Sequence, residues 1–309
     1  MMNIFLYMMT VFIWGSTWFA ITFQLSTIPI DISICYRFGL ASLLLFGWCF
    51  CKKLHLKFPR KIHLFFMAQG FFLFSINYMA AYAASHYIAS GLNAIGFSMV
   101  LVFNIINSFL FYRTPLTRPV VFGALCGGIG MMVTFLPALS TLDLSNESLI
   151  GIFLSLLGGV LASFGNMISA RNQKNNIPVM ESNAFAMGYG ALWMLGIIWF
   201  KGISLQFDTS YPYVLSLVYL SIFGSIFAFG CYLTLLGRIG ASKAAYSLVM
   251  VPIVALGVST LFEDFLWEPH IFAGIGLIIL GNIIILAKKT ARNVIIEETQ
   301  APVSLRKAA

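Results

Sequence analysis

The sequence predicts an all-α membrane protein whose ten transmembrane helices form a 5+5 inverted-topology repeat. Three observations predict this fold: an apolar composition, ten apolar stretches of spanning length, and basic residues that fall in alternate connections. Of the 309 residues, 60% are hydrophobic and only 9% are charged. A soluble domain carries about 25% charged residues, and this chain has too few polar groups to cover a surface in water. Lipid is therefore the expected solvent.

Ten apolar stretches are each long enough to cross a bilayer, which takes about 20 residues. They cover residues 3–23, 32–51, 62–83, 90–111, 119–137, 149–170, 182–200, 213–236, 244–262 and 270–287. Prolines, acidic residues and a run of lysines interrupt the apolar pattern between them, as is typical of loops. The first stretch lacks the basic start and the small-residue cleavage site of a signal peptide, so we interpret it as a retained helix.

Lysines and arginines fall in alternate connections. When the N-terminus is placed in the cytoplasm, only Lys201 lies in an outer connection and only Arg37 lies within a span. Every other basic residue is then cytoplasmic, which satisfies the positive-inside rule. The sequence therefore predicts a multi-pass protein of the cell (inner) membrane with cytoplasmic N- and C-termini. The net charge of +8 then reflects membrane insertion, and no nucleic-acid partner is expected.

Two segments of the chain resemble each other at an offset of 152 residues, one beginning at Ala89 and the other at Ala241. One gap then aligns two pairs of glycines, Gly123 with Gly274 and Gly130 with Gly281. Because each copy holds five helices, the second copy enters the membrane in the opposite direction, and the two copies share an interface at the bilayer midplane. The repeat predicts two five-helix parts, at residues 1–137 and 149–288. Residues 289–309 lack a packing pattern and are expected to form a disordered cytoplasmic tail.

Several short motifs follow one another along nearly the whole chain. They are Trp14-Gly15-Ser16-Thr17-Trp18, Arg37-Phe38 with Ala41, the Ala-Ser to Pro252 stretch, Glu263, and Gly274 to Gly281. Together they resemble the EamA family of the drug/metabolite transporter (DMT) superfamily. The resemblance implies a central cavity and the movement of small metabolites, often amino acids outward. The first repeat departs from the family pattern, with Val100 and Phe111 where the second has Pro252 and Glu263, so the halves are expected to flex unequally.

Neutral polar and aromatic side chains within the predicted spans are the candidates for a transport site, because burying polar groups in lipid is costly without a function or a partner. The predicted substrate-binding residues are Trp14, Trp18, Asn77, Tyr78, Tyr82, Asn93, Asn166, Tyr232 and Tyr246. Aromatic faces with amide groups can enclose an amphipathic molecule and hydrogen-bond its polar end. Each also has a structural interpretation, as part of an interfacial aromatic belt or as an amide that joins two helices.

Arg37 and Glu263 are the charged candidates for substrate recognition or gating. Arg37 lies about five residues into the second stretch, where it could bind a carboxylate or could snorkel to the outer interface. Glu263 ends the ninth stretch, where solvation of a helix end would also explain it. Aspartate, glutamate and histidine are missing from the middle of the predicted spans. This pattern favours a neutral or zwitterionic substrate and offers no site for a proton relay.

The predicted function is the transport of small neutral or zwitterionic, amino-acid-like metabolites by alternating access, with export implied by the resemblance. A gated channel or facilitator is a second interpretation, because only the repeat distinguishes a carrier from a pore. An intramembrane enzyme is a third, but the chain has no H-E-x-x-H motif, paired-aspartate arrangement or Ser-His pair. We therefore expect no catalytic residues, no metal and no cofactor. The expected partners are a small metabolite and the lipid bilayer, and the sequence does not specify an oligomeric state.

Overall fold

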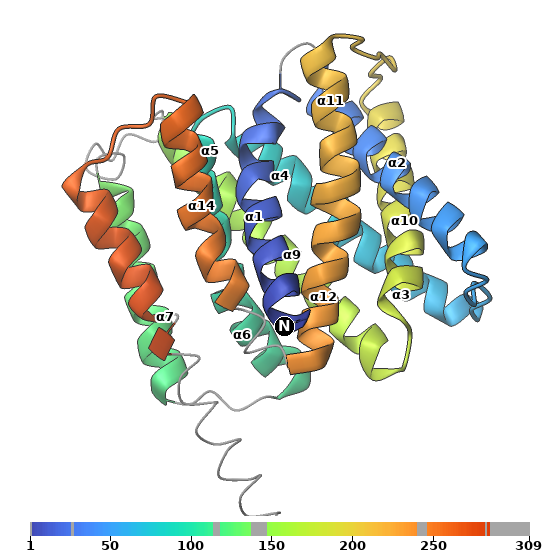
Figure 1. The fold of residues 1–309 in the computed structure, drawn as a ribbon, viewed down its shortest axis with the longest axis horizontal. Helices are drawn as coiled ribbons and strands as arrows, with labels where there is room; N and C mark the ends of the chain where they lie inside the picture. Colours follow the sequence, from blue (N-terminus) through green and yellow to red (C-terminus); the bar gives the residue numbers. More distant parts are fainter. Residues whose placement is uncertain are drawn as a thin grey trace, which may run out of the picture. The chain divides into compact units, whose positions relative to one another are not determined.

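The computed structural model describes residues 2–25, 28–113, 118–136, 147–239, 246–281 and 283–284. Every regular element in these ranges is a helix, which confirms the all-α fold for the described residues (Figure 1). Contacts divide the chain into two compact units. Unit 1 lies within Met1–Thr114 and Leu136–Trp267, and unit 2 within Pro115–Phe135 and Glu268–Ala309. The predicted tail at 289–309 lies outside the described residues.

Unit 1 takes its helices from both predicted repeats. From the first come α1 (Met2–Thr22), α2 (Ile30–Cys51), α3 (Arg60–Phe71), the π-helix η1 (Phe72–Ile76), α4 (Asn77–Ala84), α5 (Ser90–Ser98) and α6 (Val100–Tyr112). From the second come α9 (Glu147–Lys174), α10 (Val179–Phe200), α11 (Tyr211–Tyr219), the π-helix η2 (Leu220–Phe227), α12 (Ala228–Ile239) and α14 (Tyr246–Phe262). Unit 2 contains α7 (Arg118–Thr134) and the helix Pro269–Gly281.

Seven helices of the described chain are long and apolar enough to cross a membrane. They are Met2–Thr22, Ile30–Cys51, Arg60–Ala84, Ser90–Tyr112, Glu147–Lys174, Val179–Phe200 and Tyr211–Leu235. Three shorter apolar helices, Val121–Thr134, Met250–Phe262 and Pro269–Gly281, overlap the fifth, ninth and tenth predicted stretches. The helices therefore lie where the apolar pattern predicts them, while the count of ten spans and the 5+5 repeat stay predictions.

Proline marks the start of four of these helices. Pro29, Pro59 and Pro178 stand immediately before α2, α3 and α10, and Pro212 lies in the first turn of α11. Proline has no N–H to donate and its φ angle is already close to the helical value, so it is tolerated at a helix start and disfavoured further inside. These residues explain why the apolar stretches break into separate helices at these points.

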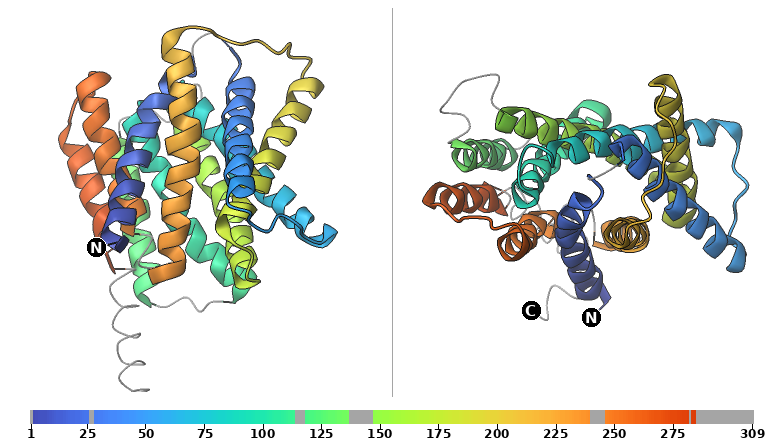
Figure 2. Two further views of the ribbon diagram at one scale, coloured as in Figure 1. Left: turned by 45° about the vertical axis from the view of Figure 1, so that its right-hand side comes forward. Right: turned by 90° about the horizontal axis from the view of Figure 1, so that it is seen from above.

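Helices from the two predicted repeats pack against each other within unit 1. The most extensive contacts join α2 to α10 and α1 to α14, and further contacts join α4 to α9. Figure 2 shows α2 and α10 next to each other and crossing at an angle. At one end of this pair, Lys201 Nζ lies 3.1 Å from Asp31 Oδ1. The ion pair joins two residues that the charge pattern places on the outer side.

A buried amide network joins α3, α9 and α10 elsewhere in unit 1. Gln69 is fully buried, and its Oε1 accepts hydrogen bonds from Asn172 Nδ2 at 3.0 Å and from Ser182 Oγ at 3.2 Å. Its Nε2 donates to Asn183 Oδ1 at 3.3 Å. Such networks offset the cost of burying polar groups by pairing them. The network fixes how α9 and α10 pack against α3.

Two spans contain π-helical segments, η1 between α3 and α4 and η2 between α11 and α12. A π-turn widens the helix and changes the backbone hydrogen bonding. In η2, the carbonyl of Gly224 accepts a hydrogen bond from Trp14 Nε1 at 3.2 Å, and the Ser225 hydroxyl donates to the Leu220 carbonyl five residues earlier. Side chains of η2 and α1 thus satisfy groups of the irregular backbone.

Glycines let the two helices of unit 2 approach at backbone distance. A Cβ added at Gly130 would lie 2.6 Å from the Gly274 carbonyl oxygen, and one at Gly274 would overlap Thr134 Oγ1. Further along the same pair, a Cβ at Gly281 would overlap the carbonyl of Gly123. Small residues are typical of close helix packing in membranes. The glycines that the offset aligns in sequence therefore make the contacts within unit 2.

Candidate functional site

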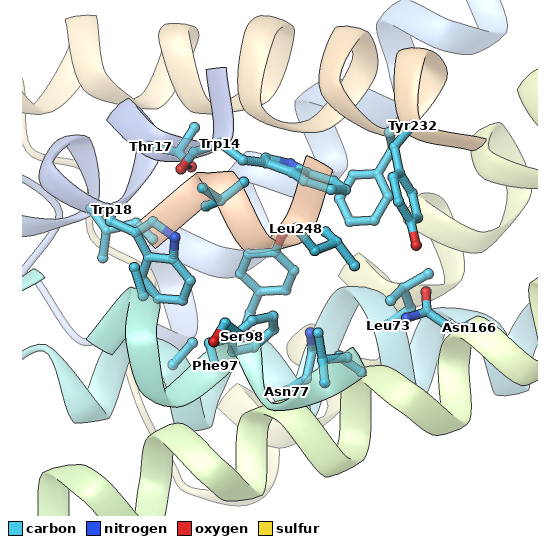
Figure 3. A pocket seen from close by; sticks show the side chains of 18 of the residues that line it. Trp14, Thr17, Trp18, Leu73, Asn77, Phe97, Ser98, Asn166, Tyr232 and Leu248 are labelled. Carbon is cyan, nitrogen blue, oxygen red and sulfur yellow. Dashed lines mark hydrogen bonds between the residues drawn. The ribbon is translucent and has the colours of Figure 1, made fainter. Parts of the chain in front are cut away.

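A cavity lies inside unit 1, among helices from both predicted repeats (Figure 3). The empty space within it and its mouth, open solvent included, is about 800 Å³. The lining residues are Trp14, Thr17, Trp18, Ile21, Arg37, Leu73, Asn77, Tyr78, Ala81, Ala94, Phe97, Ser98, Val100, Ala162, Asn166, Phe229, Tyr232, Leu248 and Val251. Most of these side chains are apolar or aromatic, so the cavity suits a solute with an apolar body.

Aromatic rings form two parts of the cavity wall. The ring centroid of Trp14 lies 5.0 Å from that of Phe229 and 5.2 Å from that of Tyr232. Trp18 packs edge-on against Phe97 with the centroids 5.2 Å apart. Edge-on and tilted contacts at these distances stabilise aromatic pairs beyond the area that they bury. The hydrogen bond from Trp14 to η2 also fixes its indole ring, so this wall is preorganised.

Arg37 places a permanent positive charge at the cavity. Its side chain is 1% exposed, although it lines the cavity. Nε donates to Ser225 Oγ at 3.1 Å and Nη1 donates to the Tyr82 hydroxyl at 3.2 Å. Cζ lies 4.7 Å from the centroid of the Tyr78 ring, within cation–π range. Arg37 therefore does not snorkel to the outer interface, which was one of the two possibilities left open by the sequence.

Two amide side chains line the cavity and differ in burial and in hydrogen bonding. Asn77 is 1% exposed, and its Oδ1 has no hydrogen-bond partner among the described residues. Asn166 is half-buried and its Nδ2 donates a long hydrogen bond of 3.4 Å to Asn104 Oδ1. In the view of Figure 3, Asn77 lies across the cavity from Trp14 and Tyr232. The amides therefore supply polar groups opposite an aromatic wall.

The structure brings most of the predicted binding residues together and leaves others aside. Those at the cavity are Trp14, Trp18, Asn77, Tyr78, Asn166 and Tyr232, together with Arg37. Tyr82 is fully buried and is not among the lining residues, and its hydroxyl accepts a hydrogen bond from the Arg37 guanidinium. Asn93 is also buried away from the cavity, with Nδ2 donating to the Ala81 carbonyl at 2.8 Å. Tyr246 begins α14, and its side chain lies outside the described part of the chain.

Glu263 does not line the cavity but joins two helix ends. Its Oε2 accepts hydrogen bonds from Ser90 at the start of α5 and from Ser259 near the end of α14. The serine at the start of α5 belongs to the Ala-Ser motif that the repeat aligns. The carboxylate therefore does more than solvate the end of its own helix, because it also attaches α14 to α5.

Several cavity residues were missing from the sequence-based prediction. Among them are Thr17, Phe97, Ser98 and Phe229. One signal could have found the last of these, because Phe229 stands 152 residues after Asn77, at the offset of the repeat. Apolar residues such as Phe97 carry no comparable signal, because phenylalanine is common throughout the spans.

The described helices, seven of them long and apolar enough to span, and the cavity among them define a multi-pass membrane protein with an internal cavity. Comparison with known families then identifies the class further. The chain belongs to the EamA-like transporter family, whose family model matches residues 1–136 and 149–287. This membership confirms the resemblance seen in the motifs. The protein is therefore a multi-pass membrane transporter.

Individual relatives resemble the chain over most of its length. Protein PagO of Salmonella typhimurium is 25% identical over 291 residues, which is 93% of each chain. An uncharacterized transporter of Archaeoglobus fulgidus is 26% identical over 289 residues, covering 91% of this chain and 97% of its own. A solved crystal structure aligns with a TM-score of 0.67 at 15% identity, over 94% of this chain and 98% of the other. At that identity, the structural match supports the fold alone.

Proposed function

We propose that the protein exports small neutral or zwitterionic, amino-acid-like metabolites through the cavity of unit 1 by alternating access. The observation that carries this proposal is the composition of the cavity, in which aromatic walls face a small number of polar groups. Sites of this kind bind amphipathic molecules by burying an apolar body and orienting its polar end. The outward direction is what the family resemblance implies.

Two features support alternating access over a simple pore. The same family model matches two successive segments, as expected of an internal duplication. The π-helices also occupy related places, because η2 (Leu220–Phe227) overlaps the segment 152 residues after η1 (Phe72–Ile76). π-turns are frequent at functional sites, and an irregular helix at the same place in both repeats would let each half bend around the cavity.

In the proposed orientation the protein lies in the inner membrane of the cell, with both termini in the cytoplasm. The positive-inside distribution supports it, and the ion pair between Asp31 and Lys201 agrees with placing these two helix ends on one side of the membrane. A membrane-impermeant reagent provides the check on intact cells. A cysteine introduced at Lys201 should react from outside and one introduced at Lys57 should not, and the reverse pattern would invert the topology.

The transport activity is tested with purified protein in liposomes. We expect saturable uptake of radiolabelled L-phenylalanine, accelerated by unlabelled L-phenylalanine on the opposite side, because a carrier exchanges solutes faster than it returns empty. Linear flux without this counterflow would support the gated channel or facilitator instead. No flux of L-phenylalanine or of other amino acids would overturn the proposed function.

A matched pair of variants assigns that flux to the cavity. Trp18 lines it and is 8% exposed, whereas Trp199 lies outside it and is 84% exposed. Trp18→Ala should reduce flux at least tenfold, as expected if the lost wall weakens binding by about 1.4 kcal/mol or more. Trp199→Ala should transport normally. Equal flux through both variants, at equal amounts of folded protein, would mean that the solute does not pass the aromatic wall.

A further inference from the structure

The partners of Arg37 distinguish it from the other charged side chains. The described ion pairs involve Asp31 with Lys201 and Glu268 with His270, and neither includes Arg37. Its guanidinium instead meets two hydroxyl groups, of Ser225 and Tyr82, and the faces of aromatic rings. All of these partners are neutral. Unit 1 therefore keeps a buried cation without a described counter-charge.

A buried charge of this kind needs an explanation, because removing an ion from water is costly unless an opposite charge compensates it. Arginine cannot lower the cost by losing its proton, since its guanidinium stays charged in proteins. A purely structural role in joining α2, α4 and η2 could be filled by a neutral amide. The charge also contributes to the cation–π contacts with Phe38 and Tyr78, but only an anion that reaches the guanidinium would compensate it.

The cavity is the route by which an anion can reach the guanidinium. Arg37 is among the lining residues, and its terminal nitrogen lies against Gly224 of η2. A Cβ added at Gly224 would lie 3.2 Å from Arg37 Nη2 and 2.8 Å from Thr17 Cγ2. The absence of a side chain at Gly224 thus lets Arg37 and Thr17, which both line the cavity, pack against the backbone of η2.

We propose that Arg37 binds the carboxylate of the transported solute and so restricts transport to molecules that carry one. The guanidinium presents N–H groups in a fork that matches the two oxygens of a carboxylate. The aromatic walls at Trp14 and Trp18 then take the apolar body of the same molecule. This inference rests on the proposed function, because it names the chemical group that the transport site recognises.

The inference excludes two other classes of solute. Apolar cations would meet a like charge at Arg37, so amines without a carboxylate are rejected. Phosphate esters carry about two negative charges at neutral pH, and within the described cavity lining they would meet a single cationic side chain. The single carboxylate of an amino acid or of a monocarboxylate pairs with the one guanidinium, and an aromatic or branched side chain occupies the apolar part of the cavity.

Matched probes test the proposal on the full-length protein purified in detergent. L-phenylalanine and L-phenylalaninamide share the ring and the amino group and differ in the carboxylate, as do 3-phenylpropionate and 3-phenylpropanamide without the amino group. Binding is measured by titration and by the shift in unfolding temperature. We expect each carboxylate to bind the unaltered protein at least about tenfold more tightly than its amide. Equal or tighter binding of the amides would overturn the proposal while leaving the transport site intact.

Variants at position 37 assign the preference to the arginine. Arg37→Gln should bind both members of each pair with similar affinity, and Arg37→Lys should keep a reduced preference for the carboxylate, because it retains the charge without the fork. Binding of the amides by Arg37→Gln shows that the variant is folded. A full preference retained by Arg37→Gln would overturn the proposal. If the unaltered protein binds none of the four probes, the proposed function fails together with the inference.

Discussion

Replacing Asn77 by leucine would separate two effects of its polar side chain, one on the stability of the fold and one on the binding of solute. Asn77 is 1% exposed, and its Oδ1 has no hydrogen-bond partner among the described residues. Its side chain also lines the cavity. Leucine has nearly the same shape and no polar atoms. We therefore expect Asn77→Leu to fold at least as stably as the unaltered protein and to bind solute more weakly.

The expected magnitudes follow from this geometry. A buried acceptor without a partner costs about 1–3 kcal/mol, and its removal should leave the free energy of unfolding unchanged or raise it by about 1 kcal/mol. The loss of one hydrogen bond to the solute costs about 1 kcal/mol, which corresponds to about fivefold weaker binding. Stability and affinity should therefore move in opposite directions.

Thermal unfolding in detergent and titration with L-phenylalanine measure the two effects. The matched control is Asn107→Leu, since Asn107 is 5% exposed, does not line the cavity and donates from Nδ2 to Ser163 Oγ at 2.8 Å. This control breaks an existing hydrogen bond and should lose about 1–3 kcal/mol of stability with unchanged binding. The reasoning is refuted if Asn77→Leu loses as much stability as the control and binds L-phenylalanine normally.

Three further substitutions test the packing. Gly274→Ala would overlap Thr134 and should destabilise unit 2 by about 1–3 kcal/mol. Gly276→Ala is the control, because no atom lies within 4 Å of its added Cβ. Equal unfolding temperatures of the two variants would contradict the close contact. Gln69→Leu leaves the amides and the hydroxyl of its network unpaired and should lower the free energy of unfolding by about 3 kcal/mol. An unchanged unfolding temperature would contradict the role of the network. Lys201→Ala should cost less than about 1 kcal/mol, because the side chain is 45% exposed and solvent screens the pair; a larger loss of unfolding temperature would mean that the pair is shielded.

The helix positions could be predicted closely from the sequence. The first stretch was expected at 3–23 and α1 is Met2–Thr22, and the seventh was expected at 182–200 and α10 is Val179–Phe200. These agreements arise because a bilayer imposes an apolar length on every span, and because prolines and charges mark the loops. The π-helices could not be predicted in this way, because their apolar residues resemble those of the neighbouring α-helices.

The apolar pattern of the sequence also did not predict which helices pack together. The sequence divides the chain into successive halves, whereas unit 2 joins α7 to the helix Pro269–Gly281, the fifth and tenth apolar stretches. The glycines indicated that some helices approach closely, but not which ones. Their partners become visible only in the contacts between Gly130 and Gly274.

The candidate site could be predicted in its residue types and less well in its orientations. Tyr78 and Tyr82 are one helical turn apart on α4, yet only Tyr78 lines the cavity, because the Tyr82 hydroxyl is turned to the Arg37 guanidinium. The burial of Arg37 depends in turn on Ser225, 188 residues away in the chain. Periodicity within one helix cannot reveal a contact across that separation.

The two hydroxyl partners of Arg37 lie on different spans, Tyr82 on α4 and Ser225 in η2. An anion that takes over the guanidinium competes with this bridge, so the free energy of ligand binding is reduced by whatever the bridge contributes. Linkage is reciprocal, and the bound ligand must weaken the attachment between the two spans by the same amount. The bridge would therefore weaken the binding of such an anion, and a stronger bridge would let the anion leave more readily.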